Sequence, residues 1–456
     1  WTHTFRRDNY EWDVGIHYIG EVHKPYSPIR RLFDLISDGE LKWSPMNKNY
    51  DRIIFPDRSY DFVAPRERFV EDMVSYFPKD EKAIMAYMDL LDQAVRSARP
   101  YFTNKAIPGI LGAITYPFMT RKFFSFSDRT TLDVLSTLTD DQQLIGVLTG
   151  QWGDQGLPPA QSSFAMHAFV ARHYLDGGNY PTGSSRSIAE TISDLIEKND
   201  GILVVNAGVK EIKVYNGVAV SVIMENGDEI EAESIISNAG VVNTINGMLG
   251  NGNGSSSLGE HLGGVEQTES YVCLHVGLNK SAKDLLKGNT NLWIYPSYDH
   301  DKNVHDYTVN PDADFPVVYV SFPSAKDEAW DENHAGYATM EAITMSRLDW
   351  YEKWKDLPWK KRGEEYETEK EKLSARILDV VFDQVPGIKD AVDYTELSTP
   401  LTVRDLANYK RGEMYGISHT PDRFRQRWLR PQSELKNLYF TGQDITTVGV
   451  SSALFS

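Results

Sequence analysis

Cysteine is almost absent from this 456-residue chain, and its scarcity excludes several kinds of protein. The single Cys273 cannot form an intramolecular disulfide or supply a multi-cysteine zinc or iron–sulfur site. The 11 histidines are scattered without an H-E-x-x-H pair, so we predict no metal site. Basic residues are also the minority, because 47 Lys and Arg against 65 Asp and Glu give a net charge of −18. Such an acidic chain repels phosphate backbones, so a nucleic-acid partner is not expected.

A long uninterrupted apolar run and a signal peptide are also missing. The nearest approach is the stretch AIPGILGAITYPFMTRKFFSF at residues 106–126, which two prolines and the pair Arg121 and Lys122 interrupt. We interpret it as a buried helix-and-loop segment of a lid. The alternative is a surface that dips into one leaflet of a membrane. The expected location is therefore cytoplasmic or peripheral to a membrane.

The length and the order of the patterns predict two domains. The middle of the chain is rich in β signals: a short buried strand at residues 202–205, an alternating strand at 209–214, and a returning strand at 218–224. Asn216-Gly217 between the last two is a type I′ hairpin signal, and Asn226-Gly227 is a second hairpin signal. A buried strand at Ile235 and Ile236 follows.

Helical patterns surround this β-rich region. Residues 187–198 form an amphipathic helix pattern, and residues 69–99 carry apolar side chains at mostly helical intervals. Residues 330–385 form a mixed block whose charge run we interpret as a solvated helix face. The Gly/Ser patch at residues 250–264 is predicted to be a flexible connection. This order predicts a discontinuous α/β domain with a second domain inserted into it.

The C-terminal stretch NLYFTGQDITTVGVSSALFS is a candidate ligand site. A short strand would end at Gly442 and be followed by a helix. Asp444 could accept hydrogen bonds from sugar-like hydroxyls, and Gly449 would let the backbone approach a flat ring closely. The same pattern also occurs at strand–helix junctions that bind nothing.

Two further stretches could contribute to chemistry. YEWDVGIHYIG contains Gly15, which again permits close approach, and then His17 and Tyr18, which either bond a ligand or serve the structure. The stretch beginning GQWGDQGLPPAQSSFAMHAF places three glycines around Trp152 and Asp154 and continues into an aromatic, Met-containing run. That run suits a long apolar ligand or ordinary core packing.

Taken together, these stretches resemble the retinol saturases, which are all-trans-retinol 13,14-reductases. That family belongs to the wider group of phytoene desaturase-like and carotenoid isomerase-like flavoproteins. The resemblance covers essentially the whole chain and is carried by WDVGIHYIG, GQWGDQGLPPAQSSFAMHAFVARHYLDGGNYPTGSSRSIAETI, EMYGISHTPDRF and LYFTGQDITTVGVSSAL. The segment at residues 150–192 is the most specific of these.

The resemblance implies an α/β fold: a doubly wound, Rossmann-like FAD-binding domain and an inserted α+β substrate domain. We assign residues 1–25, 172–250 and 400–456 to the FAD domain, and residues 26–171 and 251–399 to the substrate or lid domain. The cofactor would be FAD, with NAD or NADP as an electron donor. The positions that match the family's cofactor-binding segments are Gly15, Ile16, Val209, Asn238, Ala239, Gly240, Gly442, Asp444, Gly449 and Val450.

One expected element is not in this sequence. The G-x-G-x-x-G turn and the acid for the adenosine ribose would precede the first residue of a family member's matching segment. The chain also opens without an initiator Met and closes inside a motif, so we expect it to be part of a longer protein.

The implied reaction is the reduction of a C=C bond in an apolar conjugated polyene, a retinoid or a carotenoid. The proton-donor candidates are His17, Tyr18, His167 and Tyr415, and residues 106–126 are the candidate substrate entrance. The nearest alternatives are a carotenoid or phytoene desaturase and a cis–trans isomerase. A second alternative is a non-catalytic protein of the same fold that binds apolar lipid.

Overall fold

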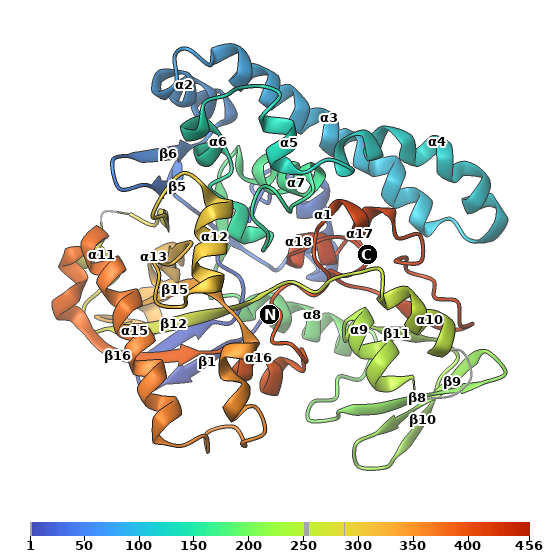
Figure 1. The fold of residues 1–456 in the computed structure, drawn as a ribbon. Coiled ribbons are helices and arrows are strands. Elements are labelled where there is room, and N and C mark those ends of the chain that lie inside the picture. The colour runs from blue at the N-terminus through green and yellow to red at the C-terminus, as the bar shows by residue number, and fades with distance from the viewer. Residues whose placement is uncertain (1, 250–254, 287) are drawn as a thin grey trace.

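A seven-stranded mixed sheet is the largest element of the computed structural model, which describes residues 2–249, 255–286 and 288–456 (Figure 1). The pairings are antiparallel except for β13 with β5, which is parallel. The strands, in spatial order, are β16 (Val392–Ser398), β12 (Ser270–Leu278), β15 (Ala338–Ser346), β14 (Val318–Ser321), β13 (Asn291–Ile294), β5 (Asn49–Ile54) and β6 (Ser59–Val63). Nearly every residue of β12 and β15 is buried, so both faces of the sheet are covered there.

Three smaller sheets and a β-hairpin make up the remaining sheets of the described residues. The hairpin is β1 (Thr4–Arg7) with β2 (Tyr10–Asp13). The three sheets are β3–β7–β4 (Ile19–Gly20, Gly178–Pro181, Trp43–Pro45), β8–β9–β10 (Val209–Tyr215, Val218–Met224, Glu229–Glu231) and the parallel pair β11–β17 (Ile235–Ser237, Leu438–Phe440).

The longer helices are α1 (Pro28–Ile36), α2 (Arg66–Tyr76), α3 (Glu81–Ala106), α4 (Gly109–Ser127), α7 (Phe164–Tyr174), α8 (Arg186–Lys198), α12 (His300–Val309) and α15 (Glu364–Gln384). The shorter ones are α5 (Thr131–Leu135), α6 (Gln142–Leu148), α9 (Val241–Asn243), α10 (Ser255–Leu262), α11 (Ala282–Leu285), α13 (Pro323–Lys326), α14 (Trp330–His334), α16 (Pro400–Ala407), α17 (Pro421–Arg425) and α18 (Val450–Ala453).

The predicted β meander is confirmed in its second half. Strands β8 and β9 form an antiparallel hairpin, and Asn216 and Gly217 have φ values of 51° and 76°, as a type I′ turn requires. Strand β10 returns after Asn226-Gly227. The apolar faces of β8, β9, β11 and β17 share one hydrophobic cluster, so these separate chain segments form one unit.

The prediction of a strand at residues 202–205 is wrong. These residues form no strand, and their four apolar side chains are between 52% and 86% exposed. Ile236 in β11, predicted to be buried, is also 68% exposed. A parallel strand needs a neighbour for its hydrogen bonds, and among the described residues none pairs with this segment.

The predicted helical regions are found, but one of them is divided into two helices and the predicted burial of another is corrected. Residues 69–99 lie in two helices, α2 and α3, which separate at Pro78 because a proline disfavours helix in the residue before it. The interpretation of residues 106–126 as buried is wrong for the first half of α4, where Ile110 is 81% and Phe118 is 83% exposed. The predicted Gly/Ser connection becomes helix α10 from Ser255 onward, and its residues 250–254 lie outside the described residues.

The predicted helix at residues 187–198 is confirmed as α8. Ile188 of α8 packs in a cluster with Ile16, with Phe33 of α1 and with Val450 of α18. Segments from the start, the middle and the end of the chain therefore meet here, as a discontinuous α/β domain requires. The strands of the large sheet all fall inside the two segments assigned to the substrate domain, and the exact domain boundaries stay a prediction.

Candidate active site

Asp444 joins three separate segments below the end of β17. Its Oδ2 accepts a hydrogen bond from the N–H of Val241 at 2.8 Å, and its Oδ1 accepts one from the N–H of Ile417 at 3.0 Å. The residue is 4% exposed. These bonds tie the loop after β17 to α9 and to residue 417. Each carboxylate oxygen keeps a second lone pair, so the predicted role of Asp444 as an acceptor for sugar-like hydroxyls stays a prediction.

The glycines around Asp444 are required by close packing. A Cβ on Gly416 would lie 2.2 Å from Asp444 Oδ1, and a Cβ on Gly442 would lie 2.1 Å from Asn238 Oδ1. Gly240, at φ +86°, has Asp444 Oδ2 3.5 Å from its Cβ position. The structure thus brings Asn238, Gly240, Gly442 and Asp444 into one place, as the sequence predicted.

Arg423 holds this loop together, and the sequence reasoning missed it. The buried guanidinium donates to the carbonyl oxygens of residues 417, 443, 444 and 446 at 2.6–3.2 Å. His419 Nε2 accepts the N–H of Val448 at 3.0 Å. Both residues lie in the EMYGISHTPDRF region, but nothing local marks an arginine as a buried clamp.

The remaining cofactor candidates lie in different places. Ile16 and Val450 pack in the same hydrophobic cluster, while Gly15 and Gly449 are exposed. The carbonyl of Ala239 accepts a hydrogen bond from Asn243 Nδ2 at 3.0 Å. Val209 opens β8 opposite Met224. Ile212 and Val214 of that strand join the hydrophobic cluster that contains β11 and β17, and Val209 is not one of its members.

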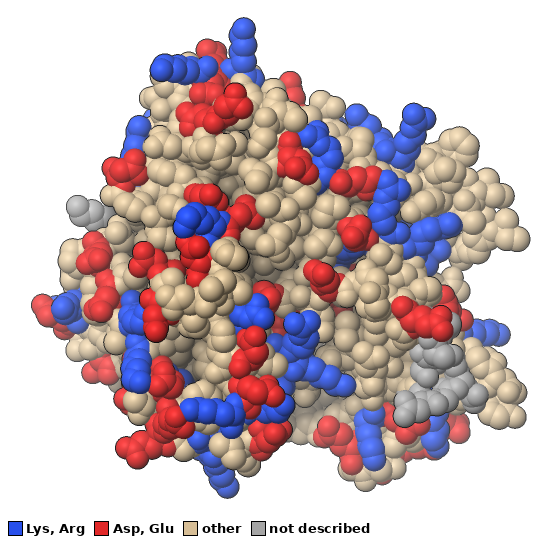
Figure 2. All heavy atoms as spheres, viewed as in Figure 1, with Lys and Arg blue, Asp and Glu red and all other residues tan. Residues whose placement is uncertain are grey.

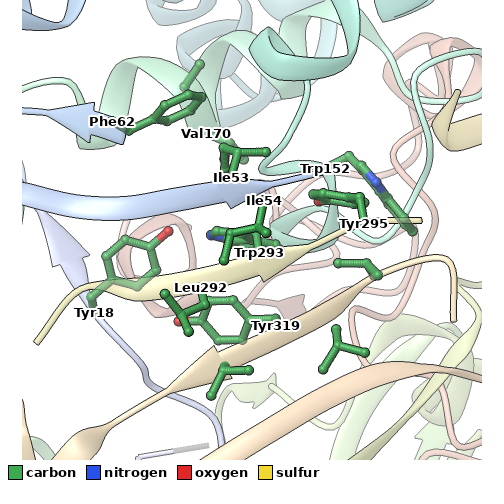
Figure 3. Packing of buried hydrophobic residues seen from close by; sticks show 14 of the residues in the cluster. Tyr18, Ile53, Ile54, Phe62, Trp152, Val170, Leu292, Trp293, Tyr295 and Tyr319 are labelled. Atoms are coloured by element: carbon green, nitrogen blue, oxygen red, sulfur yellow. The ribbon is translucent and has the colours of Figure 1, made fainter. Parts of the chain in front are cut away.

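Tyr18 lies among the buried aromatic rings of the large hydrophobic cluster (Figure 3). Its hydroxyl is 2.9 Å from Asp51 Oδ2 and 3.2 Å from Asp154 Oδ2, and its ring stacks on Tyr174 at 4.0 Å. Lys326 Nζ lies 5.6 Å from the centre of the Tyr18 ring and donates to Ser321 Oγ at 2.7 Å. Burial lowers the pKa of Lys326 to about 8.

His17 faces a different acid. Its Nδ1 lies 3.0 Å from Glu341 Oε2, although the two atoms do not meet hydrogen-bond geometry. Burial, and then the Lys326 ammonium, lower the pKa of His17 to about 3. Burial raises the pKa of Glu341 to about 8. The imidazole is therefore neutral near pH 7 and is a weak acid for protonating a substrate.

The other two proton-donor candidates lie in different surroundings. Tyr415 adjoins Gly156, whose Cβ position is 2.8 Å from Tyr415 Cδ2, so it belongs near Asp154. His167 instead contacts the hydroxyl of Tyr87 on α3 at 2.9 Å. Burial lowers the pKa of His167 to about 4, so it too is neutral. The structure brings His17, Tyr18 and Tyr415 toward one region, and the contact of His167 points into the helical layer.

These residues fit a flat dinucleotide against exposed backbone. Gly449 has φ +94°, and nothing lies within 4 Å of its Cβ position, so a planar ring could approach this backbone. Gly15 and Asn238 expose their surfaces as well. The Gly15 segment then leads within three residues to Tyr18 and the buried acids.

Comparison with solved structures defines the class of fold. An oxidoreductase from Methanosarcina mazei covers 99% of this chain and 88% of its own with a TM-score of 0.60 at 12% identity. A variant of putrescine oxidase covers the same shares with a TM-score of 0.61, also at 12% identity. The chain therefore has the α/β fold of these redox enzymes, which confirms the predicted fold class. No family model matches the chain.

The chain belongs to the all-trans-retinol 13,14-reductase family of oxidoreductases. It is 31% identical to the all-trans-retinol 13,14-reductase of Danio rerio, over 99% of this chain and 78% of the relative. It is 29% identical to the Homo sapiens protein of that name, over 99% and 77%. The resemblance inferred from the motifs is confirmed.

Two other relatives bear on the alternatives. A Danio rerio protein named inactive all-trans-retinol 13,14-reductase is 27% identical over 99% of this chain and 77% of its own length. The prolycopene isomerase of Arabidopsis thaliana is 28% identical but covers 53% of this chain and 37% of its own length. The isomerase alternative is thus the weaker match, and the activity itself has to be argued from the site.

Proposed function

We propose that the protein is an FAD-dependent reductase that saturates one C=C bond of an apolar conjugated polyene, with the 13,14 bond of all-trans-retinol as the substrate bond. The observation that carries this is the course of the Gly15 segment. Ile16 packs with Val450 beside the exposed Gly449, and Tyr18 bonds Asp51 and contacts Asp154. A ring lying on the Gly15 and Gly449 backbones would therefore face the buried acids and tyrosines.

Reduced FAD, when bound, supplies the hydride for such a reaction. This chain's residues do the rest. Gly449 leaves room for a planar ring, Gly15 is exposed, and Arg423 fixes the loop that carries Gly442 and Asp444. The aromatic side chains of the large sheet exclude water from the polyene, and the group around Tyr18 holds the proton.

Anaerobic single turnover tests this function. Full-length holoprotein reduced with dithionite is mixed with all-trans-retinol, and the flavin absorbance and the product mass are followed. We expect the oxidised flavin spectrum to return and the product to be two hydrogens heavier than retinol. A product of unchanged mass would indicate an isomerase, and a colourless protein that binds retinol would indicate a lipid carrier.

We also propose that a reduced nicotinamide nucleotide returns the flavin to its reduced state, since it is a hydride donor of the appropriate class. NADH and NADPH are added separately to oxidised holoprotein without oxygen. Bleaching of the flavin by one of them supports the proposal, and persistence of the oxidised spectrum with both rejects it.

Helix α4 supports a further proposal, a contact with an anionic membrane surface. The side chains of Ile110, Leu111, Ile114 and Phe118 are 61–83% exposed and lie along one stretch of the helix. Figure 2 shows this apolar tip beside a group of basic side chains. Arg121 and Lys122 are exposed on the same helix, and Arg427 lies over the ring of Tyr116 on that helix at 4.3 Å.

Exposed apolar side chains next to basic ones are typical of a surface that binds anionic lipid, and here they occur on a protein whose net charge is −18. No helix in the described residues has the length and apolar character to cross a bilayer. We expect the double variant Ile114→Asp and Phe118→Asp to lose sedimentation with phosphatidylserine vesicles. Val309→Asp, at a 72% exposed apolar position on α12, is the matched control and should sediment like wild type.

A further inference from the structure

The buried region around Tyr18 holds more acid than it can keep ionised. Lys326 lies within electrostatic reach of Asp13, Asp51, Asp154 and Glu341, so one ammonium faces four carboxyl groups. Burying three uncompensated negative charges is far more costly than binding protons. Some of these four groups must therefore carry a proton near neutral pH.

Hydrogen bonding decides which groups are ionised. Asp51 accepts bonds from the Tyr18 hydroxyl, Gln151 Nε2 and Asn291 Nδ2 at 2.7–2.9 Å. Asp13 accepts bonds from the N–H of Ser185 and the hydroxyl of Tyr180. Such donors stabilise a carboxylate.

Asp154 and Glu341 have fewer hydrogen-bond donors than Asp51 and Asp13. Among the described residues, the Tyr18 hydroxyl, at 3.2 Å, is the hydrogen-bond partner of Asp154. Neither oxygen of Glu341 has a partner at full hydrogen-bond geometry, and the N–H of Asp13 is the one backbone group that lowers its pKa. Because a phenol has one proton, Tyr18 cannot donate to both Asp51 and Asp154. A proton on Asp154 resolves this, since Asp154 then donates to Tyr18, and Tyr18 donates to Asp51.

Of these two acids, Asp154 is placed to reach a ligand. Glu341 is fully enclosed, with 0% exposure, against His17. Asp154 is partly exposed, as are its neighbours Tyr174 and Tyr415.

The glycines of the GQWGDQG motif explain how Asp154 comes so close to aromatic rings. A Cβ on Gly153 would lie 2.7 Å from the Trp293 ring, and a Cβ on Gly156 would lie 2.8 Å from the Tyr415 ring. Trp293 in turn packs on Tyr319 at 4.4 Å (Figure 3). Flat rings around one acid suit a flat conjugated chain.

We propose that Asp154 is the acid that protonates the polyene, an inference that rests on the proposed function. Reduced FAD, when bound, would supply the hydride for a C–H bond at one carbon of the C=C bond and would itself be oxidised. The π electron pair would form the second C–H bond with the Asp154 proton as the Asp154 O–H bond breaks. The alkene would then be reduced, and Asp154 would be left as a carboxylate that regains a proton from solvent.

The groups that face Asp154 come from every element packed around it. They are Tyr18 after β2, Asp51 on β5, Tyr174 on α7, Tyr271 on β12, Tyr295 after β13, Tyr319 on β14, Lys326 on α13 and Tyr415 before β17. Burial, and then the Asp51 carboxylate, raise the pKa of Asp154 well above its usual range. Burial likewise raises the pKa of these tyrosines, so Asp154 is the stronger acid among them.

The test compares wild type, Asp154→Asn and the control Asp301→Asn in the anaerobic single turnover with all-trans-retinol. Asp301 is a second acid whose pKa burial raises, to about 6, and its carboxylate accepts the N–H of Ala160 and is not among the groups that face Asp154. We expect Asp154→Asn to slow flavin reoxidation by about 100-fold or more. Asp301→Asn should reoxidise like wild type, and retinol affinity, followed by retinol fluorescence, should be the same in all three proteins.

A second measurement does not depend on bound flavin. Infrared spectra of wild type minus each variant are recorded at neutral pH. Wild type minus Asp154→Asn should show a protonated-carboxyl band, and Asp301→Asn should retain that band. Asp154→Glu keeps an acid, so it should recover part of the rate with a shifted pH profile, which separates proton donation from a folding defect.

The outcomes separate the two proposals. If wild type does not reoxidise with retinol, the proposed function fails and this inference fails with it. If wild type reoxidises and Asp154→Asn does so equally fast, or loses no carboxyl band, the proton-donor role alone is overturned.

Discussion

At the scale of single residues, Gly442 is tied to its position by two independent constraints. It has φ +95°, and the Asn238 side chain occupies the place of a Cβ. We expect Gly442→Ala to destabilise the fold by about 1–2 kcal/mol for the backbone alone and by about 1–3 kcal/mol more for the displaced side chain. Urea denaturation measures the sum of these two contributions.

Gly217→Ala is the matched control for that prediction. Gly217 also has a left-handed φ, +76°, but nothing lies within 4 Å of its Cβ position. Gly217→Ala should therefore lower the free energy of unfolding by the backbone contribution alone. Equal destabilisation of the two variants would show that Asn238 does not pack against Gly442 in solution.

Glu341 gives a prediction about pH. Burial raises its pKa from 4.5 to about 8, so the folded chain holds this proton more tightly than the unfolded chain does. The resulting stabilisation is complete below about pH 4.5 and is lost as the pH rises to about 8, at up to about 1.4 kcal/mol per pH unit. Glu341→Gln cannot titrate, so its free energy of unfolding should fall less steeply between pH 6 and 8.

The control for this pH series is Glu371→Gln, at an exposed position on α15. Denaturation of each variant at pH 5, 6, 7 and 8 gives the slopes. The same slope in wild type, Glu371→Gln and Glu341→Gln would mean that Glu341 is ionised in the folded protein throughout this range.

At the scale of elements, the loop between β17 and α18 depends on a single guanidinium. Arg423 bonds four carbonyls there and at residue 417, and a lysine can supply neither the number nor the directions of those bonds. We expect Arg423→Lys to cost about 1–3 kcal/mol for each carbonyl left unsatisfied and to speed amide hydrogen exchange at residues 442–450.

Arg430 is the matched arginine for that experiment. It bonds the carbonyls of Asn104, Lys105 and Ile107 at the end of α3. Arg430→Lys should speed exchange near residues 104–112 and leave residues 442–450 unchanged. Faster exchange at residues 442–450 in both variants would contradict a local clamp.

At the scale of the whole molecule, FAD should stabilise the fold by joining its separate segments. A ligand at 100 times its Kd adds about 2.7 kcal/mol to the free energy of unfolding. We expect FAD to raise the Tm of the full-length protein and to raise it less in Gly449→Ala, because the added methyl group would occupy the open space at Gly449 where the proposed ring would lie. Gly217→Ala should respond to FAD like wild type.

Local patterns in the sequence were sufficient for much of this fold. The Asn216-Gly217 hairpin and helix α8 are specified by neighbouring residues, and both are found. The prediction of a strand at residues 202–205 is wrong because an apolar run in the sequence does not show whether a second strand is available to pair with it. Exposure of Ile110 and Phe118 depends on what packs against α4, which periodicity does not describe.

The glycines and Asp444 of the C-terminal loop were predictable from the sequence, and the hydrogen bonds among the buried acids around Tyr18 were not. Gly442 and Asp444 stand in one motif, so their proximity is a local property. Tyr18 and Asp154 are 136 positions apart, and the Glu341 contact with His17 spans most of the chain. The properties that matter there are burial and shared protons, which arise only when the large sheet and the Gly15 segment come together.

A structure of the full-length protein with FAD and a retinol analogue tests most directly whether the scattered glycines and acids form one redox site. The account predicts an isoalloxazine ring against the Gly15 and Gly449 backbones, with the polyene between that ring and Asp154 among Tyr174, Trp293 and Tyr415. A flavin bound away from Gly15 and Gly449, or a polyene out of reach of Asp154, would contradict it.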